Sequence, residues 1–295
     1  MRGHIGFPTD KPTSFWLAML RKRRERMYAE KLDLREPIRW TSEEERIACI
    51  RFFNAAYRAE ESGRGQAHAL ADEVESWDAE LAECLRLYGD EEGWHKELLE
   101  EFIPALGGSI TPMRTLTRVM YGTYGRAKRM DTILLTNLMF ETIGSTTYRI
   151  ALGRVKQPQI RQMLTILTRD ESFHVPLNVH FLNAVWKRSG FASMRVRMVY
   201  NTVLLGLVAS AKRSRKAAGA FDHIGFKELA QAYVENIGKL FVTRPDLGLM
   251  PPRPLLFAIG LDRARIASSD FDPTSLEAAL RAVDREKVEV SALLS

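Results

Sequence analysis

Two short stretches of this sequence decide its fold, and they read Asp90-Glu91-Glu92-Gly93-Trp94-His95 and Asp170-Glu171-Ser172-Phe173-His174. Each stretch contains Glu-x-x-His preceded by another acid. Because residues three apart share one face of a helix, the carboxylate and the imidazole of each stretch can bind one metal ion together. Two such matches among six histidines are expected by chance in roughly one or two chains per thousand. The repeated motif therefore predicts a metal site built on helices.

A site for two metal ions in a four-helix bundle needs one further glutamate from each of the two remaining helices. Glu60 precedes Glu92 by 32 residues, and Glu141 precedes Glu171 by 30 residues, so each interval fits one antiparallel hairpin. Glu141 lies on an apolar stripe that should face the core, where a lone acid is costly unless something pairs with it. The predicted metal ligands are Glu60, Glu92, His95, Glu141, Glu171 and His174.

The first of these ligands has a neighbour of the same type, Glu61. Glu60 is favoured because it continues the apolar face of its helix, and because Glu60-x-x-Gly63 repeats the pattern Glu141-x-x-Gly144. Glu61 stays the alternative. The two glycines either clear space beside the metals or allow close helix packing.

Helical signals run along almost the whole chain, and strand-like alternation is scarce. We expect an all-α fold with a four-helix bundle over residues 41–190, which the resemblance described below makes ferritin-like. A basic helical arm covers residues 1–40, and residues 191–295 form accessory helices packed on the bundle, as a lid or an oligomer interface. Pro176 should kink its helix or start a new one. The helices are expected near residues 14–31, 42–72, 78–103, 128–154, 159–187, 194–213, 226–242 and 275–294.

Composition restricts the class of protein. Apolar residues make up 45% of the chain and charged residues 27%, which is usual for a globular protein. No apolar run reaches the roughly 18 residues that cross a bilayer, and no secretory signal pattern is found at the N-terminus. Cys49 and Cys84 have no metal or redox spacing, so they are expected to be reduced thiols of a cytoplasmic protein.

Part of the net charge of +6 is local and lies in two basic clusters, residues 21–26 and 212–216. Solvated surfaces are the expected interpretation of both clusters. The functional alternative is an acidic partner: an acyl carrier protein, a coenzyme A tail or, least favoured, nucleic acid, for which no binding motif is found.

The ligand pattern resembles that of the ferritin-like di-iron carboxylate superfamily over about residues 42–187. The resemblance implies that Glu60, Glu92 and His95 chiefly serve one metal and Glu141, Glu171 and His174 the other, with some carboxylates bridging. It also implies acids that anchor the second N–H of each histidine. We expect Glu91 and Asp170 in this role, each reaching the histidine of the other motif.

Hard carboxylates with one imidazole per ion suit iron or manganese, and the absence of thiolate ligands disfavours structural zinc. Two iron ions, or a mixed Mn/Fe pair, are expected, with O2 as co-substrate. Tyr57, Tyr88 and Tyr148 fall near the height of the ligands, where they could bear a radical or donate hydrogen bonds, although core packing is the simpler interpretation. The other histidines are expected to be packed or surface residues: His4, His68, His180 and His223.

The resemblance implies a di-iron oxygenase or oxidase that hydroxylates, desaturates or N-oxygenates a small or carrier-bound organic substrate in specialised metabolism. An external electron donor is expected, and a homodimer is compatible with the sequence. Leu167 stands where the arylamine N-oxygenases of the superfamily carry an additional histidine, so the resemblance to that subgroup is broken. The alternatives are a ferroxidase or non-catalytic metal-binding oligomer, and a helical interaction protein without metal.

Overall fold

The computed structural model describes residues 11–112, 129–189, 193–213, 226–242 and 247–268. Within these ranges the chain forms nine α-helices and no strand, which confirms the all-α class. The four helices that carry the predicted ligands are α2 (Glu43–Val74), α3 (Ala79–Ala105), α5 (Met130–Leu152) and α6 (Pro158–Ser189).

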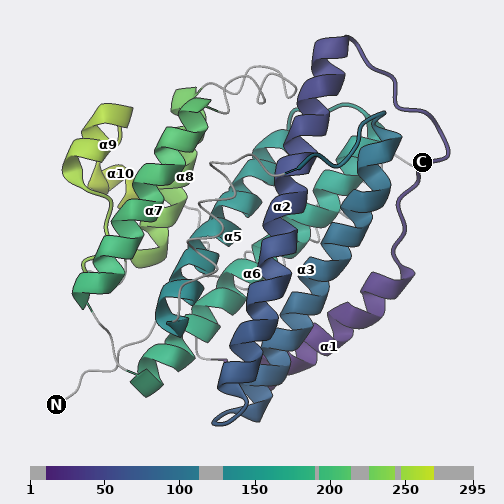
Figure 1. The fold of residues 1–295 in the computed structure, drawn as a ribbon. Coiled ribbons are helices and arrows are strands. Elements are labelled where there is room, and N and C mark those ends of the chain that lie inside the picture. Colours follow the sequence, from purple (N-terminus) through teal and green to yellow (C-terminus); the bar gives the residue numbers. More distant parts are fainter. Residues whose placement is uncertain (1–10, 113–128, 190–192, 214–225, 243–246, 269–295) are drawn as a thin grey trace.

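The sequence sets the ends of these helices through local capping. The Ser42 side chain accepts a hydrogen bond from the Glu45 amide at the start of α2, and Asp78 caps α3 through the Leu81 amide. Such caps satisfy amides that have no partner within the helix. A short turn joins α2 to α3 and another joins α5 to α6, so each pair is an antiparallel hairpin, and Figure 1 shows the four helices side by side.

The core of the four helices is divided into two apolar clusters with a polar layer between them. One cluster gathers the end of α2, the start of α3 and the second half of α6; its members include Leu70, Leu85 and Phe181. The other gathers the opposite ends of the same helices and includes Phe53, Phe102 and Leu164. The predicted metal ligands lie between the two clusters, shielded from water at both ends.

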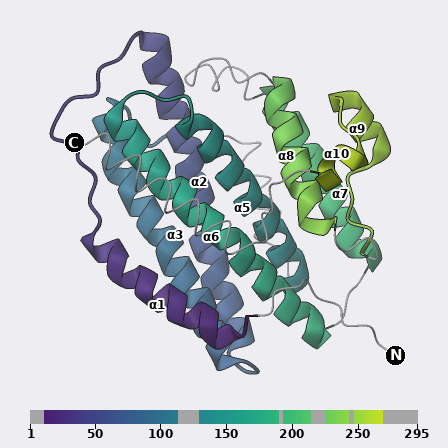
Figure 2. The same ribbon diagram turned by 180° about the vertical axis from the view of Figure 1, so that it is seen from behind.

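Helix α1 (Thr13–Ala29) lies outside the four helices, across α3 and α6, as the view from behind shows (Figure 2). Its apolar residues Trp16, Leu17 and Leu20 are buried in the first cluster. Arg23 and Arg26 also turn inward and form ion pairs with buried acids. The interpretation of residues 21–26 as a solvated face is therefore wrong for these two arginines.

Of the remaining helices, α7 and α8 pack beside α5, on the side away from α1, and α9 and α10 pack on α8 (Figures 1 and 2). They are α7 (Ser193–Arg213), α8 (Phe226–Phe241), α9 (Arg253–Ile259) and α10 (Arg263–Ser268). Helix α9 follows a pair of prolines, with Pro252 at its N-cap and Pro254 in its first turn. Prolines suit the first turn of a helix, where an amide has no partner, and Gly260 (φ 73°) ends α9 in the left-handed conformation.

Pro176 lies inside α6 without starting a new helix. The expected helix 275–294 and most of the basic cluster 212–216 lie outside the described residues, and the division at residues 40 and 190 stays a prediction. Among the helices described, none has the length and apolar character to span a membrane.

Candidate metal centre

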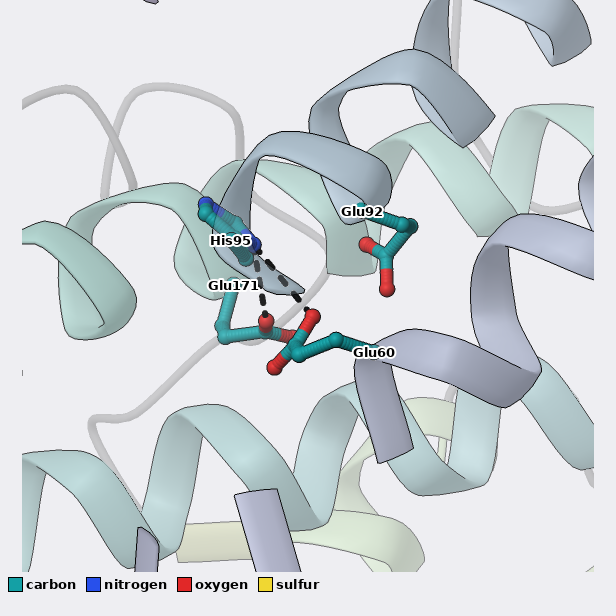
Figure 3. A group of neighbouring side chains, drawn as sticks. All are labelled: Glu60, Glu92, His95 and Glu171. Atoms are coloured by element: carbon teal, nitrogen blue, oxygen red, sulfur yellow. Dashed lines mark hydrogen bonds and ion pairs between the residues drawn. The ribbon is translucent and has the colours of Figure 1, made fainter. Parts of the chain in front are cut away.

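The polar layer brings together all six side chains that the sequence singled out. His95 and His174 are fully buried, and the four glutamates are between 2% and 7% exposed. Figure 3 shows Glu60, Glu92, His95 and Glu171 pointing toward one another from α2, α3 and α6. The matching group on the other side adds Glu141 of α5 and His174 of α6.

The donors fall into two overlapping groups that could each hold a metal ion. One contains Glu60 and His95, and the other contains Glu141 and His174; Glu92 and Glu171 belong to both. Within each group one donor atom per residue lies within 4.8 Å of all the others. Two groups that share two carboxylates have the form of a paired metal site.

Both imidazoles turn their Nδ1 atom toward the carboxylates. His95 Nδ1 lies 3.3 Å from Glu60 Oε2 and 3.9 Å from Glu171 Oε1. His174 Nδ1 lies 3.0 Å from Glu92 Oε1, 3.4 Å from Glu141 Oε2 and 3.9 Å from Glu171 Oε2. The two helical hairpins thus present the same atoms to a common centre.

The Nε2 atoms face outward and meet the acids that precede the motifs, in a crossed arrangement. His95 Nε2 lies 3.2 Å from Asp170 Oδ2, and His174 Nε2 lies 3.3 Å from Glu91 Oε2. An ionised carboxylate only accepts, so it holds a proton on Nε2, and Nδ1 is the nitrogen that can bind a metal once it has lost its own proton.

Several atoms at the centre have no hydrogen bond although they are buried. They are Glu92 Oε1, Glu141 Oε2 and His174 Nδ1. His174 Nδ1 lies within ion-pair distance of both oxygens, but none of the three atoms takes part in a hydrogen bond. Buried polar groups are nearly always hydrogen-bonded. Three buried atoms without hydrogen bonds, all of them able to bind a metal ion and close to one point, therefore fit a shell of metal ligands.

Charge supports the same interpretation. Burial and the neighbouring Glu60 and Glu141 raise the pKa of Glu92 well above its usual value. Burial and nearby carboxylates raise the pKa of Glu171 in the same way. Burial alone would lower the pKa of His95, but hydrogen bonds with Asp170 and Glu60 raise it to about 10. Four ionised glutamates would repel one another strongly here, and two divalent cations would balance their charge.

A third set of close donors, Glu91, His95 and Asp170, is better explained without a metal. Arg23 hydrogen-bonds to Glu91 and Asp170, and Arg169 also hydrogen-bonds to Asp170. These guanidinium groups already supply the cations that the two acids need.

No known family model, curated protein or solved structure matches this chain. The argument for function accordingly rests on the residues of the site itself.

Two of the three predicted tyrosines touch the centre. Tyr88 donates a hydrogen bond to Glu141, and Tyr148 donates one to Glu60 Oε1 at 3.3 Å. Tyr57 instead donates to Glu100 Oε1 at 2.9 Å and packs in the second apolar cluster, away from the ligands.

Glu61 also points elsewhere, because its carboxylate pairs with Arg58 at 2.6 Å and its side chain is 40% exposed. Of the adjacent pair, Glu60 is the residue that the structure places in the layer. His180 is buried and hydrogen-bonds to Thr13 Oγ1 at 3.2 Å, and His68 pairs with Asp90 near the surface. His4 and His223 lie outside the described residues.

The two repeated glycines make room for the carboxylates that both groups share. A Cβ atom at Gly63 would lie 2.5 Å from Glu92 Oε2, and one at Gly144 would lie 3.3 Å from Glu171 Oε2. The missing side chain at each glycine therefore leaves room in the layer for the carboxylate of the neighbouring helix.

Sequence analysis missed the three arginines beside the histidine-anchoring acids: Arg23, Arg26 and Arg169. One signal was present, since Arg23 and Arg26 are three apart and share a helix face. It was hidden in a run where almost every residue is charged. Arg169 also hydrogen-bonds to both oxygens of Glu30, just beyond α1.

Proposed function

We propose that this chain is a ferritin-like, non-haem di-iron protein that uses O2 to oxidise an organic substrate. The observation that carries the proposal is the buried layer in which four glutamates and two histidines form two overlapping donor groups. Such a layer is costly for a folded protein unless cations occupy it.

The proposed ligands follow from the two groups. Glu60 and His95 would hold one ion and Glu141 and His174 the other, while Glu92 and Glu171, which belong to both donor groups, would complete the two sets. Oxygen donors with one imidazole per ion suit iron, or a mixed Mn/Fe pair. Cys49 and Cys84 lie in the apolar clusters and not among these donors, which disfavours a thiolate-bound metal.

Reduced iron ions, when bound, would supply the electrons and the open positions that activate O2. The chain itself holds the donors in place and keeps water out. The apolar clusters at both ends of the layer exclude solvent. Tyr88 and Tyr148 each keep a proton on the hydroxyl that faces a glutamate, and so fix the orientation of Glu141 and Glu60.

The partners of this chemistry form part of the proposal. A small substrate, or one carried by coenzyme A or an acyl carrier protein, would be oxidised, and an external donor would return electrons to the iron. A cytoplasmic homodimer is compatible with this scheme.

Repeated cycles of reduction and exposure to O2 test the oxidase proposal without knowledge of the substrate. Protein loaded with Fe(II) is reduced anaerobically with dithionite, freed of the reductant by gel filtration, exposed to limiting O2 and reduced again, while O2 uptake and iron content are measured. A parallel sample receives excess Fe(II) before each exposure to O2. We expect uptake in every cycle and a constant two irons per chain. If added Fe(II) accumulates as ferric iron well beyond two per chain, the protein is a ferroxidase and the proposal is wrong.

A further inference from the structure

Arg23 of α1 lies where the two outward-facing histidine nitrogens come together. Its Nε lies 3.1 Å from Glu91 Oε2, and its Nη2 lies 2.5 Å from Glu91 Oε1 and 2.8 Å from Asp170 Oδ1. The guanidinium stacks over Phe173, with Cζ 4.0 Å from the ring centroid. The Arg23 side chain is only 8% exposed, so this contact is part of the protein interior.

One guanidinium thereby joins both crossed pairs of acid and histidine. Glu91 anchors His174, and Asp170 anchors His95. The four helices that carry the ligands do not supply this connection; it comes from a helix that lies across them (Figure 2).

We propose that Arg23 is a positioning residue of the metal centre, which fixes the His174 imidazole through Glu91 and contributes to fixing His95 through Asp170. The inference rests on the proposed metal site and assigns to α1 the role of orienting its histidine ligands. A guanidinium suits this role because its planar fork can bind one carboxylate with two parallel bonds and still reach a second, which an ammonium cannot do.

The two acids do not depend on Arg23 equally. Asp170 Oδ1 also accepts from Arg26 Nη2 at 2.7 Å and from Arg169 Nε at 2.8 Å. Among the described residues, Arg23 is the arginine that hydrogen-bonds to Glu91, and the next guanidinium, that of Arg26, lies 3.8 Å away. Loss of Arg23 should therefore release Glu91 and His174, whereas Asp170 and His95 keep two other cations.

The asymmetry makes the inference testable by metal titration. Metal-free protein is titrated with Mn(II), and free Mn(II) is counted by its EPR signal. We expect Arg23→Gln to weaken one of the two sites by about 10- to 100-fold, the usual effect of losing a residue that orients a metal ligand, and the other site much less. Arg169→Gln removes a cation from Asp170 only, which keeps Arg23 and Arg26, so this variant should change the affinity of both sites little.

A His174→Ala background identifies the affected site. There, Arg23→Gln should change the affinity of the remaining site little, because the histidine through which it acts is gone. In a His95→Ala background the full loss should persist. Arg21→Gln is the matched control, because Arg21 lies on the same helix, is 60% exposed and pairs with Glu83 at the surface. This variant should bind as the wild type does.

Two further measurements separate positioning from folding. The visible spectrum of bound Co(II) reports ligand geometry, and it should change in Arg23→Gln but not in Arg21→Gln. Arg23→Lys keeps the charge and should restore less than half of the lost binding free energy. If Arg23→Gln fails to fold, the double variant Arg23→Gln/Glu91→Gln, which buries no unpaired charge, should show the same selective loss.

Several results would overturn the inference. They are an Arg23→Gln variant with wild-type affinity at both sites, equal losses at both sites, or full rescue by lysine. These results would leave the proposed function standing. A wild-type chain that binds no metal would instead remove the proposed function and the inference together.

Discussion

Replacement of Gly63 by alanine should weaken metal binding and leave the metal-free fold intact. The new Cβ would lie 2.5 Å from Glu92 Oε2, and ordinary contact begins near 3.4 Å, so the carboxylate must withdraw by about 0.9 Å. Because the end of a flexible side chain can move, folding should tolerate the change. Metal ligands, however, must sit within about 0.2 Å of their positions.

The expected loss of metal affinity is at least about tenfold, because displacing a ligand should cost no less than removing a residue that orients one. Gly144→Ala should lose less, since its Cβ would lie 3.3 Å from Glu171 Oε2. Gly65→Ala is the control: nothing lies within 4 Å of its Cβ. It should bind metal normally and gain about 0.5–1 kcal/mol of helix stability.

Titration of the metal-free variants with Fe(II) under anaerobic conditions measures these affinities, and thermal unfolding measures the fold. We expect the affinity to fall in the order Gly65→Ala, Gly144→Ala, Gly63→Ala, with similar unfolding temperatures. A Gly63→Ala variant that binds two ions as tightly as the wild type would refute the role given to Glu92.

Other predictions concern stability. Removal of metal with a chelator should lower the unfolding temperature, because binding at 100 times the Kd adds about 2.7 kcal/mol. Glu171→Gln should raise the unfolding temperature of the metal-free protein, since it removes one of four crowded carboxylates, and should abolish tight binding of a pair of ions. Burial lowers the pKa of His180 from 6.5 to about 4. The unfolded chain therefore binds a proton at His180 more readily than the folded protein does. The free energy of unfolding is unaffected above pH 6.5 and falls by on the order of 3 kcal/mol as the pH drops to 4 and below. His180→Phe should unfold with a weaker pH dependence over this range, as denaturant titrations at each pH would show.

The sequence predicted the four long helices because their ends carry local signals. Ser42 and Asp78 are caps whose bonds involve residues three positions on, and such bonds follow from sequence spacing alone. The grouping of Glu60, Glu92 and His95 was predictable for a similar reason. Helical periodicity fixes which residues share a face, and two equal hairpins bring their faces together.

The position of α1 could not be predicted in this way. Between Arg21 and Arg26 every residue but one carries the same charge sign, so periodicity does not tell which of them turns inward. Only the packing of Trp16 and Leu20 against the core sets the rotation that buries Arg23. The inward turn depends on long-range contacts, which sequence spacing does not contain.

The surroundings of Pro176 and Tyr57 also depend on contacts between distant parts of the sequence. Proline removes one hydrogen bond from a helix, but burial of α6 along its length keeps the helix continuous. Tyr57 lies one helical turn from Glu60 along α2, yet its hydroxyl hydrogen-bonds to Glu100 on α3 and not to a metal ligand. Side-chain direction is decided by partners that lie far apart in the sequence.

The central claim, that this chain holds a pair of metal ions in its buried carboxylate layer, is tested most directly by counting ions. Metal-free protein is saturated with Fe(II) without oxygen, and bound iron is measured after gel filtration. The account predicts two ions per chain for the wild type and for Glu61→Gln, and at most one for Glu60→Gln. A wild-type chain with fewer than two ions, or a Glu60→Gln variant that still holds two, would contradict it.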